Sequence, residues 1–135
     1  MISRNEPITI HKIMNKFETG DFTLLDHFSE NIDLVIEHYN DDTDVSWQRC
    51  ETKQGLTAVL QQLVQDVFPK GTKILGLESI TIGDGWFISN FSQQFWYGVQ
   101  EQTVVGSSVI ISHENEAGQV DYFREVVQSV NPVSV

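Results

Sequence analysis

The second half of the chain carries four stretches in which apolar and polar residues tend to alternate. They run roughly over Lys73–Ile82, Trp86–Tyr97, Thr103–His113 and Gln119–Val127. Alternation with a period of two is typical of β-strands that turn one face toward a core. The sequences GDG at Gly83–Gly85 and NEAG at Asn115–Gly118 are typical of hairpin turns. The pattern therefore predicts one long, mostly antiparallel sheet.

Helical patterns lie ahead of these strands. Glu6–Thr19 has apolar residues at helical spacing, a short second helix is expected after Asp21, and a third apolar stripe runs from Leu56 to Val67. Two short strands are expected between the second and third helices. Helices ahead of a run of antiparallel strands are typical of the α+β class. We predict three N-terminal helices packed on a strongly curved sheet, in a single domain over residues 1–135.

The charge balance narrows the classes of partner. The chain has 19 acidic and 8 basic residues, a formal net charge of −11. Nucleic acids and anionic membranes are bound by clustered lysine and arginine, so neither is an expected partner. Because the sequence lacks a secretion signal and a membrane span, we expect a cytoplasmic protein. Cys50 is the single cysteine, which excludes an intramolecular disulfide, and no motif predicts a metal site or a cofactor.

The segment AGQVDYFREVVQ, Ala117–Gln128, places two carboxylates beside an aromatic ring. Side chains alternate along a strand, so Asp121, Phe123 and Glu125 are expected on one face. If that face lines the interior, each carboxylate must be paired, hydrated or protonated, because burial of an unpaired charge is costly. The two Cα atoms would lie roughly 13 Å apart, too far to share one proton. We therefore expect a separate partner for each, most naturally a histidine on a neighbouring strand.

The order of these segments resembles the nuclear-transport-factor-two-like superfamily, whose members include steroid isomerases, SnoaL-like polyketide cyclases and limonene epoxide hydrolases. The resemblance covers nearly the whole chain. It rests on GDFTLLDHFSENIDLVI after the first helix, GLTAVLQQLVQDVFP as the third helix, and the closing hairpin SHENEAGQVDYFREVV. It implies a cystatin-like cone in which the concave side of the sheet faces a pocket for a small hydrophobic molecule. It also implies a homodimer through the outer sheet face, where Trp86 and Trp96 are expected.

Alignment with the steroid-isomerase pattern assigns an inner face to each strand. That face would carry alternate residues, including Val105, Ser107, Val109, Ile111 and His113 on the third long strand. The three polar groups that steroid isomerases require fall on Ile36, Ile13 and Val109 in this alignment. All three residues are apolar, so the resemblance does not imply a steroid-isomerase mechanism.

Four titratable residues on the expected inner face are candidate catalytic residues: His38, His113, Asp121 and Glu125. A histidine oriented by a carboxylate can transfer a proton near neutral pH. The alternative is structural, with Asp121 and His113 partly solvated near the hairpin and Glu125 paired with an arginine or a backbone group. The candidate pocket-lining residues are Trp47, Phe91, Phe95, Tyr97 and Phe123, which can equally form a filled core.

Two classes of function remain open on the sequence. The first is a cofactor-free, SnoaL-like enzyme that applies acid/base chemistry to a small hydrophobic carbonyl or hydroxyl compound. The second is a non-catalytic ligand-binding or dimerisation module of the same fold. An open cone with convergent polar groups would favour the enzyme, and a filled interior would favour the module.

Overall fold

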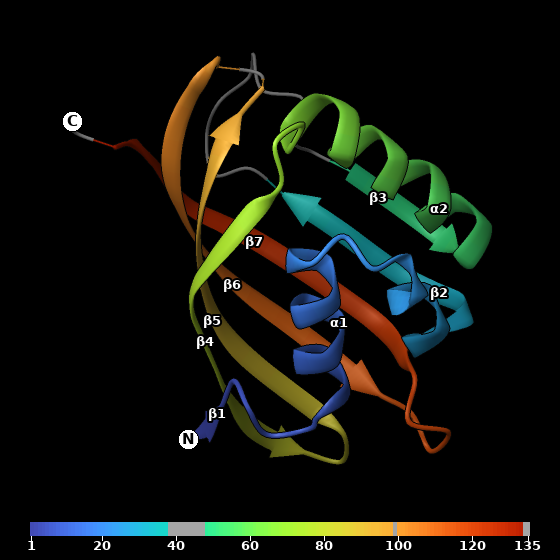
Figure 1. Ribbon diagram of the computed structural model, residues 1–135. Coiled ribbons are helices and arrows are strands. Elements are labelled where there is room, and N and C mark those ends of the chain that lie inside the picture. The colour runs from blue at the N-terminus through green and yellow to red at the C-terminus, as the bar shows by residue number, and fades with distance from the viewer. Residues whose placement is uncertain (38–47, 99, 134–135) are drawn as a thin grey trace.

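The computed structural model describes residues 1–37, 48–98 and 100–133, and it combines a curled sheet with a layer of helices (Figure 1). The helical segments are α1 (Thr9–Glu18), the 3-10 helix η1 (Phe22–His27), α2 (Lys53–Gln62) and its π-helical continuation η2 (Leu63–Val67). The strands are β1 (Ile2–Ser3), β2 (Phe28–Glu37), β3 (Gln48–Thr52), β4 (Thr72–Gly83), β5 (Trp86–Tyr97), β6 (Gln102–Glu114) and β7 (Val120–Pro132). Within the described residues, no helix has the length and apolar character needed to cross a membrane.

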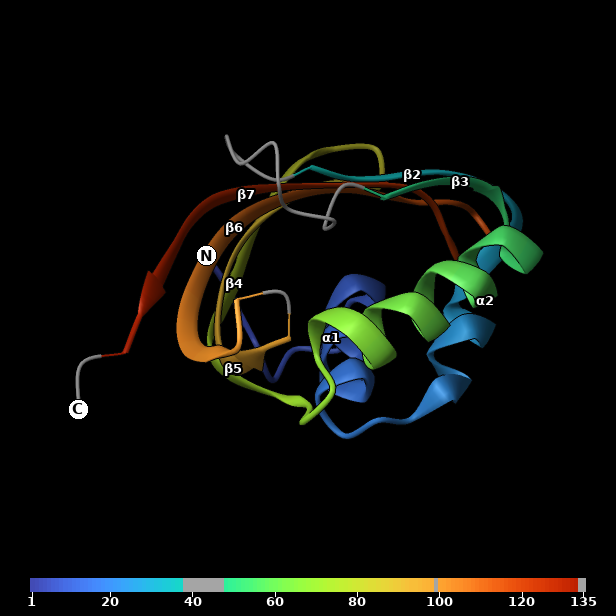
Figure 2. The same cartoon turned by 90° about the horizontal axis from the view of Figure 1, so that it is seen from above.

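The seven strands form one sheet in the order β1-β4-β5-β6-β7-β2-β3. Neighbouring strands are antiparallel except β2 and β7, which run parallel. Seen from above, the sheet curls around α1 and α2, which lie on its concave side (Figure 2). Register shifts in β4, between Ile74 and Gly76, and in β7 contribute to this curvature, because a bulge bends its strand and increases the twist.

The α+β class and the curved sheet are confirmed, whereas the expectation of three N-terminal helices is not. Asp21 accepts a hydrogen bond from the Thr23 N–H and starts the second helical segment, but Phe28 already begins β2. This short connection holds only a 3-10 helix. The third helix, α2, follows β2 and β3 in the chain, and its N-cap is Thr52, whose Oγ1 accepts from the Gly55 N–H at 2.9 Å.

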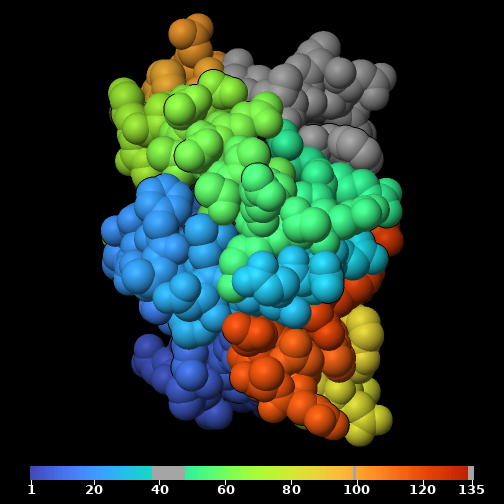
Figure 3. Space-filling model, turned by 90° about the vertical axis from the view of Figure 1, so that its right-hand side faces the viewer, coloured from blue at the N-terminus to red at the C-terminus, as the bar shows by residue number. Residues whose placement is uncertain are grey.

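The core lies between the helices and the inner face of the sheet. α1 contributes Ile10, Ile13 and Met14, and α2 contributes Leu56 and Leu60, all of them buried. The helices form a continuous surface over the concave side, as the space-filling view in Figure 3 shows. Side chains on the inner face of the sheet are thereby shielded from bulk water, and a cavity lies between these two layers.

Candidate functional site

A cavity of about 100 Å³ lies between the helices and the inner face of β2, β5, β6 and β7. Four of the predicted pocket-lining residues do line it: Phe91, Phe95, Tyr97 and Phe123. The fifth, Trp47, lies outside the described residues. An apolar cavity of roughly 150 Å³ can hold a benzene ring, so this one is of the order of size of a single compact ring or a branched chain.

Four polar side chains line this otherwise apolar cavity: Gln93, Tyr97, Ser108 and Glu125. No lysine, arginine or histidine is among the described lining residues. The cavity therefore suits a neutral, mostly apolar molecule that carries a polar group. An anionic ligand would meet no cation among the described lining residues.

Glu125 is the only carboxyl among the described residues that line the cavity. It lies in β7 between Ile110 of β6 and Ile36 of β2, and only 8% of its surface is exposed. Burial raises the pKa of its carboxyl, and a hydrogen bond with Ser108 partly opposes this shift. The carboxyl therefore keeps its proton to a higher pH than an exposed glutamate. The inward orientation expected for Glu125 is confirmed, but the group beside it is a serine rather than a histidine.

His113 and Asp121 form the expected pair, with His113 Nδ1 2.6 Å from the Asp121 carboxylate. The expectation that they face the pocket is wrong, because neither residue lines the cavity. His113 packs instead against Trp86, with ring centroids 4.7 Å apart, and Trp86 packs in turn against Tyr122. Its Nε2 lies 3.2 Å from the Asp84 carbonyl oxygen in the β4–β5 turn. The pair thus joins the β6–β7 end of the sheet to that turn.

The error comes from the orientation of β6, where the predicted inner face is the outer face. The buried residues of β6 are Val104, Gly106, Ser108, Ile110 and Ser112, whereas the predicted set, Val105, Ser107, Val109, Ile111 and His113, is only partly buried. Ile13 and Ile36 line the cavity as the alignment implies, but Val109 does not. His38 lies outside the described residues. A register shift opposite His113 and Glu114 leaves Asp121 as an extra residue, which accounts for its contact with His113.

Gln93 and Ser108 are cavity residues that were not candidates. Gln93 lies in β5, is 6% exposed, and its Oε1 accepts a hydrogen bond from Thr72 Oγ1 at 2.6 Å. The Phe-rich alternation of β5 places Gln93 on the inner face. A polar residue among inward aromatic rings is the sequence feature that could have identified Gln93 as a cavity residue. Ser108 carried no such signal, because it follows Ser107 and both residues suit either face.

A second buried polar cluster fastens α1 to the sheet. His11 is 1% exposed, and its Nε2 lies 2.7 Å from Ser79 Oγ, which lies 2.6 Å from Ser89 Oγ. His11 Nδ1 faces the Glu6 carbonyl oxygen at 3.2 Å, so Nδ1 carries the hydrogen and Nε2 accepts from Ser79. Burial lowers the pKa of His11, although backbone hydrogen bonds oppose the shift. None of these residues lines the cavity.

No family model matches the chain, and no curated protein matches it. Among solved structures, a nuclear-transport-factor-two-like protein from Anabaena variabilis superposes with a TM-score of 0.72 and 13% identity, over 99% of this chain and 97% of that one. Bal32a, from a soil-derived mobile gene cassette, gives 0.71 and 18% identity over 90% and 87% of the two chains. An LEH-like epoxide hydrolase from M. tuberculosis gives 0.63 and 12% identity over 89% and 80%. The chain has the nuclear-transport-factor-two-like fold, which confirms the resemblance at the level of fold.

Proposed function

We propose that this protein binds a small, mostly apolar compound in its cone and moves a proton on it through Glu125, without a cofactor. The observation that carries the proposal is a buried carboxyl that lines an apolar cavity, with Ser108 as its hydrogen-bond partner. A carboxyl whose pKa is raised toward neutrality can serve as both base and acid in one turnover. One solved structure of this fold is described as an LEH-like epoxide hydrolase, which supports enzymatic chemistry as one use of the fold.

The reaction that best suits one carboxyl is a proton shift next to a carbonyl group. The Glu125 carboxylate takes a proton from the carbon adjacent to the carbonyl, which leaves an enolate and a neutral carboxylic acid. The same carboxyl then returns a proton to carbon. The electron pair stays on the substrate throughout, so no oxidant or second ionisable group is required. A mechanism that needs only one carboxyl fits this cavity, because Glu125 is the one carboxyl or histidine among the described lining residues.

Deuterium exchange tests the proposal without knowledge of the natural substrate. Cyclopentanone in deuterated water would be followed by proton NMR for loss of its α-protons, with wild-type protein, Glu125→Gln and the control Glu116→Gln, which changes an exposed turn residue. We expect wild type and the control to accelerate exchange and Glu125→Gln to lose about 100-fold or more of that acceleration. Equal rates for Glu125→Gln and wild type would refute the role of Glu125 and leave the ligand-binding module as the better interpretation.

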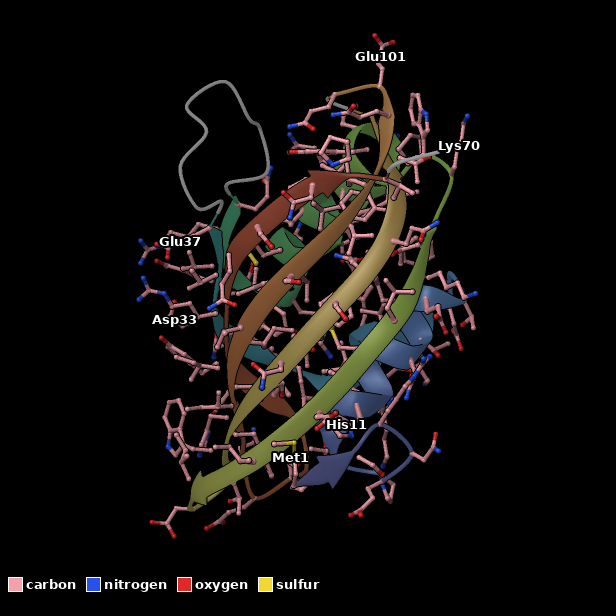
Figure 4. The ribbon with its side chains drawn as sticks, turned by 90° about the vertical axis from the view of Figure 1, so that its left-hand side faces the viewer. Met1, His11, Asp33, Glu37, Lys70 and Glu101 are labelled. Carbon is pink, nitrogen blue, oxygen red and sulfur yellow. The ribbon has the colours of Figure 1, made fainter. Side chains whose placement is uncertain are left out.

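We also propose that two copies associate through the outer face of the sheet. Apolar side chains on adjacent strands form an outer apolar patch: Ile80, Ile82, Trp86, Ile88, Val109, Ile111 and Val126. Ile80 and Ile82 are 43% and 54% exposed. Figure 4 looks onto this face, where Lys70 also lies, with its Nζ 4.4 Å from the ring centroid of Trp96. A second copy of the patch would cover it.

A cytoplasmic location stays a prediction.

A further inference from the structure

We infer that Gln93 is a specificity-determining residue: held by Thr72, it turns its amide N–H groups toward the cavity and selects a ligand with a hydrogen-bond acceptor. The ligand class is then a neutral compound of about ring size with a carbonyl oxygen, rather than a hydrocarbon. This inference rests on the proposed use of the cavity as a ligand site. It adds the residue that chooses the ligand.

The orientation of the amide follows from one hydrogen bond. Thr72 Oγ1 lies 2.6 Å from Gln93 Oε1 but 3.5 Å from the Gln94 carbonyl oxygen. A separation of 2.6 Å is typical of O–H···O bonds and shorter than the usual N–H···O bond, so the Thr72 hydroxyl donates to the Gln93 oxygen. The amide oxygen is thereby used inside the protein. The NH₂ group, with two donors, is left for the cavity that Gln93 lines.

The space beside this amide is kept open by a glycine. Gly106 of β6 is the direct cross-strand neighbour of Gln93 and also lines the cavity. A Cβ added at Gly106 would lie 3.5 Å from Phe95 Cε1, an ordinary contact, so the backbone tolerates a side chain there. A larger residue at this position would fill the volume next to the amide. The glycine therefore leaves room for a ligand atom beside the Gln93 donors.

The chemistry of the walls then sets the ligand class. Apart from Gln93, Tyr97, Ser108 and Glu125, the described lining residues are apolar or glycine, so a charged ligand would lose its hydration without compensation. A hydrocarbon of the right shape would displace water from the Gln93 N–H groups and leave them without an acceptor. A carbonyl oxygen satisfies these donors. The preference thus comes from a penalty against ligands that lack an acceptor.

The test uses two probes of matched shape, cyclopentanone and methylenecyclopentane, titrated at millimolar concentration into the full chain. The chain has two methionines, so ¹³C-methyl labelling gives a cavity signal from Met14 and an internal reference from Met1, which is 80% exposed. The variants are Thr72→Val and Gln93→Met. The matched controls are Thr81→Val on the same strand as Thr72 and Gln94→Met, the exposed neighbour of Gln93. The quantity compared is the ratio of ketone affinity to alkene affinity.

We expect this ratio to fall about three- to tenfold in Thr72→Val and Gln93→Met and to stay unchanged in both controls. A ratio that is unchanged in both variants, with both probes still bound, would overturn the role of Gln93 while leaving the cavity as a ligand site. If neither probe shifts the Met14 signal of the wild type, the proposed function fails and this inference with it. Should Gln93→Met fail to fold, Thr72→Val decides, because valine keeps the shape of threonine and removes only the hydroxyl.

Discussion

Glu18 and Glu125 show how surroundings shift the pKa of the same side chain in opposite directions. Burial acts on Glu18 to raise its pKa, but hydrogen bonds from the Ile74 N–H and from Arg4, each 2.6 Å long, lower it overall. Among the described residues, no cation lowers the pKa of Glu125, and burial raises it. The ionised form of Glu18 therefore ties α1 to β4, whereas the ionised form of Glu125 opposes folding. A residue that weakens the fold in this way is a candidate for function.

The raised pKa of Glu125 makes the stability of the fold depend on pH. Its pKa is raised above the ordinary 4.5, so the folded state favours the protonated form. Its contribution to stability is complete below pH 4.5 and is lost as the pH rises through the folded-state pKa. Glu125→Gln removes this loss, and we expect its free energy of unfolding to exceed that of wild type by a margin that grows from pH 4.5 to pH 8.

Urea denaturation of wild type, Glu125→Gln and Glu116→Gln between pH 4.5 and pH 8.5 would measure this difference. Glu116→Gln serves as the control because its side chain is exposed. If the difference in free energy of unfolding between Glu125→Gln and wild type does not grow with pH, then folding does not raise the pKa of Glu125.

His11 makes stability depend on pH in the opposite direction from Glu125. Its pKa is lowered below 6.5, mainly by burial, so stability is complete above pH 6.5 and is lost as the pH falls through the folded-state pKa. Ser79→Ala leaves the buried Nε2 without its hydroxyl donor, and we expect a loss of about 1–3 kcal/mol at pH 7.5. Thermal unfolding of Ser79→Ala beside Ser107→Ala, a partly buried serine on the outer face, checks the prediction. Equal losses in both variants would contradict it.

At the scale of elements, the sequence predicted strands better than it predicted their faces. The limits of β5 were predicted residue for residue, and its inner face was also predicted, since Phe87, Phe91, Phe95 and Tyr97 lie on one side of the alternation. β6 instead reads VVGSSVII over residues 104–111, and each doublet puts similar side chains on both faces. Alternation then carries no information about orientation. The register shift at Asp121 was equally invisible, because a bulge depends on pairing with the neighbouring strand.

The His113–Asp121 pair belongs to this scale, because it joins the sheet end to the β4–β5 turn through Asp84. We expect Asp121→Asn to lower stability by about 0.5–1.5 kcal/mol, since the bond loses its charge, and to leave cyclopentanone exchange unchanged. Chemical denaturation and the exchange assay measure the two effects. A loss of exchange at full stability would restore Asp121 to the catalytic machinery.

At the scale of the whole molecule, the fold places a small cavity on one side of the sheet and an apolar patch on the other. The order of helices and hairpins was enough to predict the α+β class and the curved sheet. The sequence alone left the cavity undecided, because Phe91, Phe95 and Phe123 suit a filled core as well as a pocket wall. What distinguishes the two is the absence of a side chain at Gly106 together with the inward Gln93 and Glu125, a combination that depends on three neighbouring strands.

The outer apolar patch yields a prediction about assembly. Ile88 lies between Ile80 and Ile111, its cross-strand neighbours, so a lysine there would be buried in a dimer interface. We expect wild type to sediment as a dimer and Ile88→Lys to raise the dissociation constant about 100-fold or more. Val64→Lys is the control, since Val64 is an exposed apolar residue on the helical side. A monomeric wild type at micromolar concentration would refute the dimer.

The parallel pairing of β2 with β7 has a consequence for the nascent chain. Leu34 and Ile36 of β2 and Phe123 and Glu125 of β7 meet across this pairing and form one wall of the cavity. β7 follows all the other described strands in the chain, so a ribosome makes it after them. The β4–β5 and β5–β6 hairpins can therefore form while this wall of the cavity is still missing. Until β7 docks, Glu125 stays in water as an ordinary ionised carboxylate. The chain thus acquires its buried acid only after β7 has been made, when the long-range pairing of β2 with β7 forms.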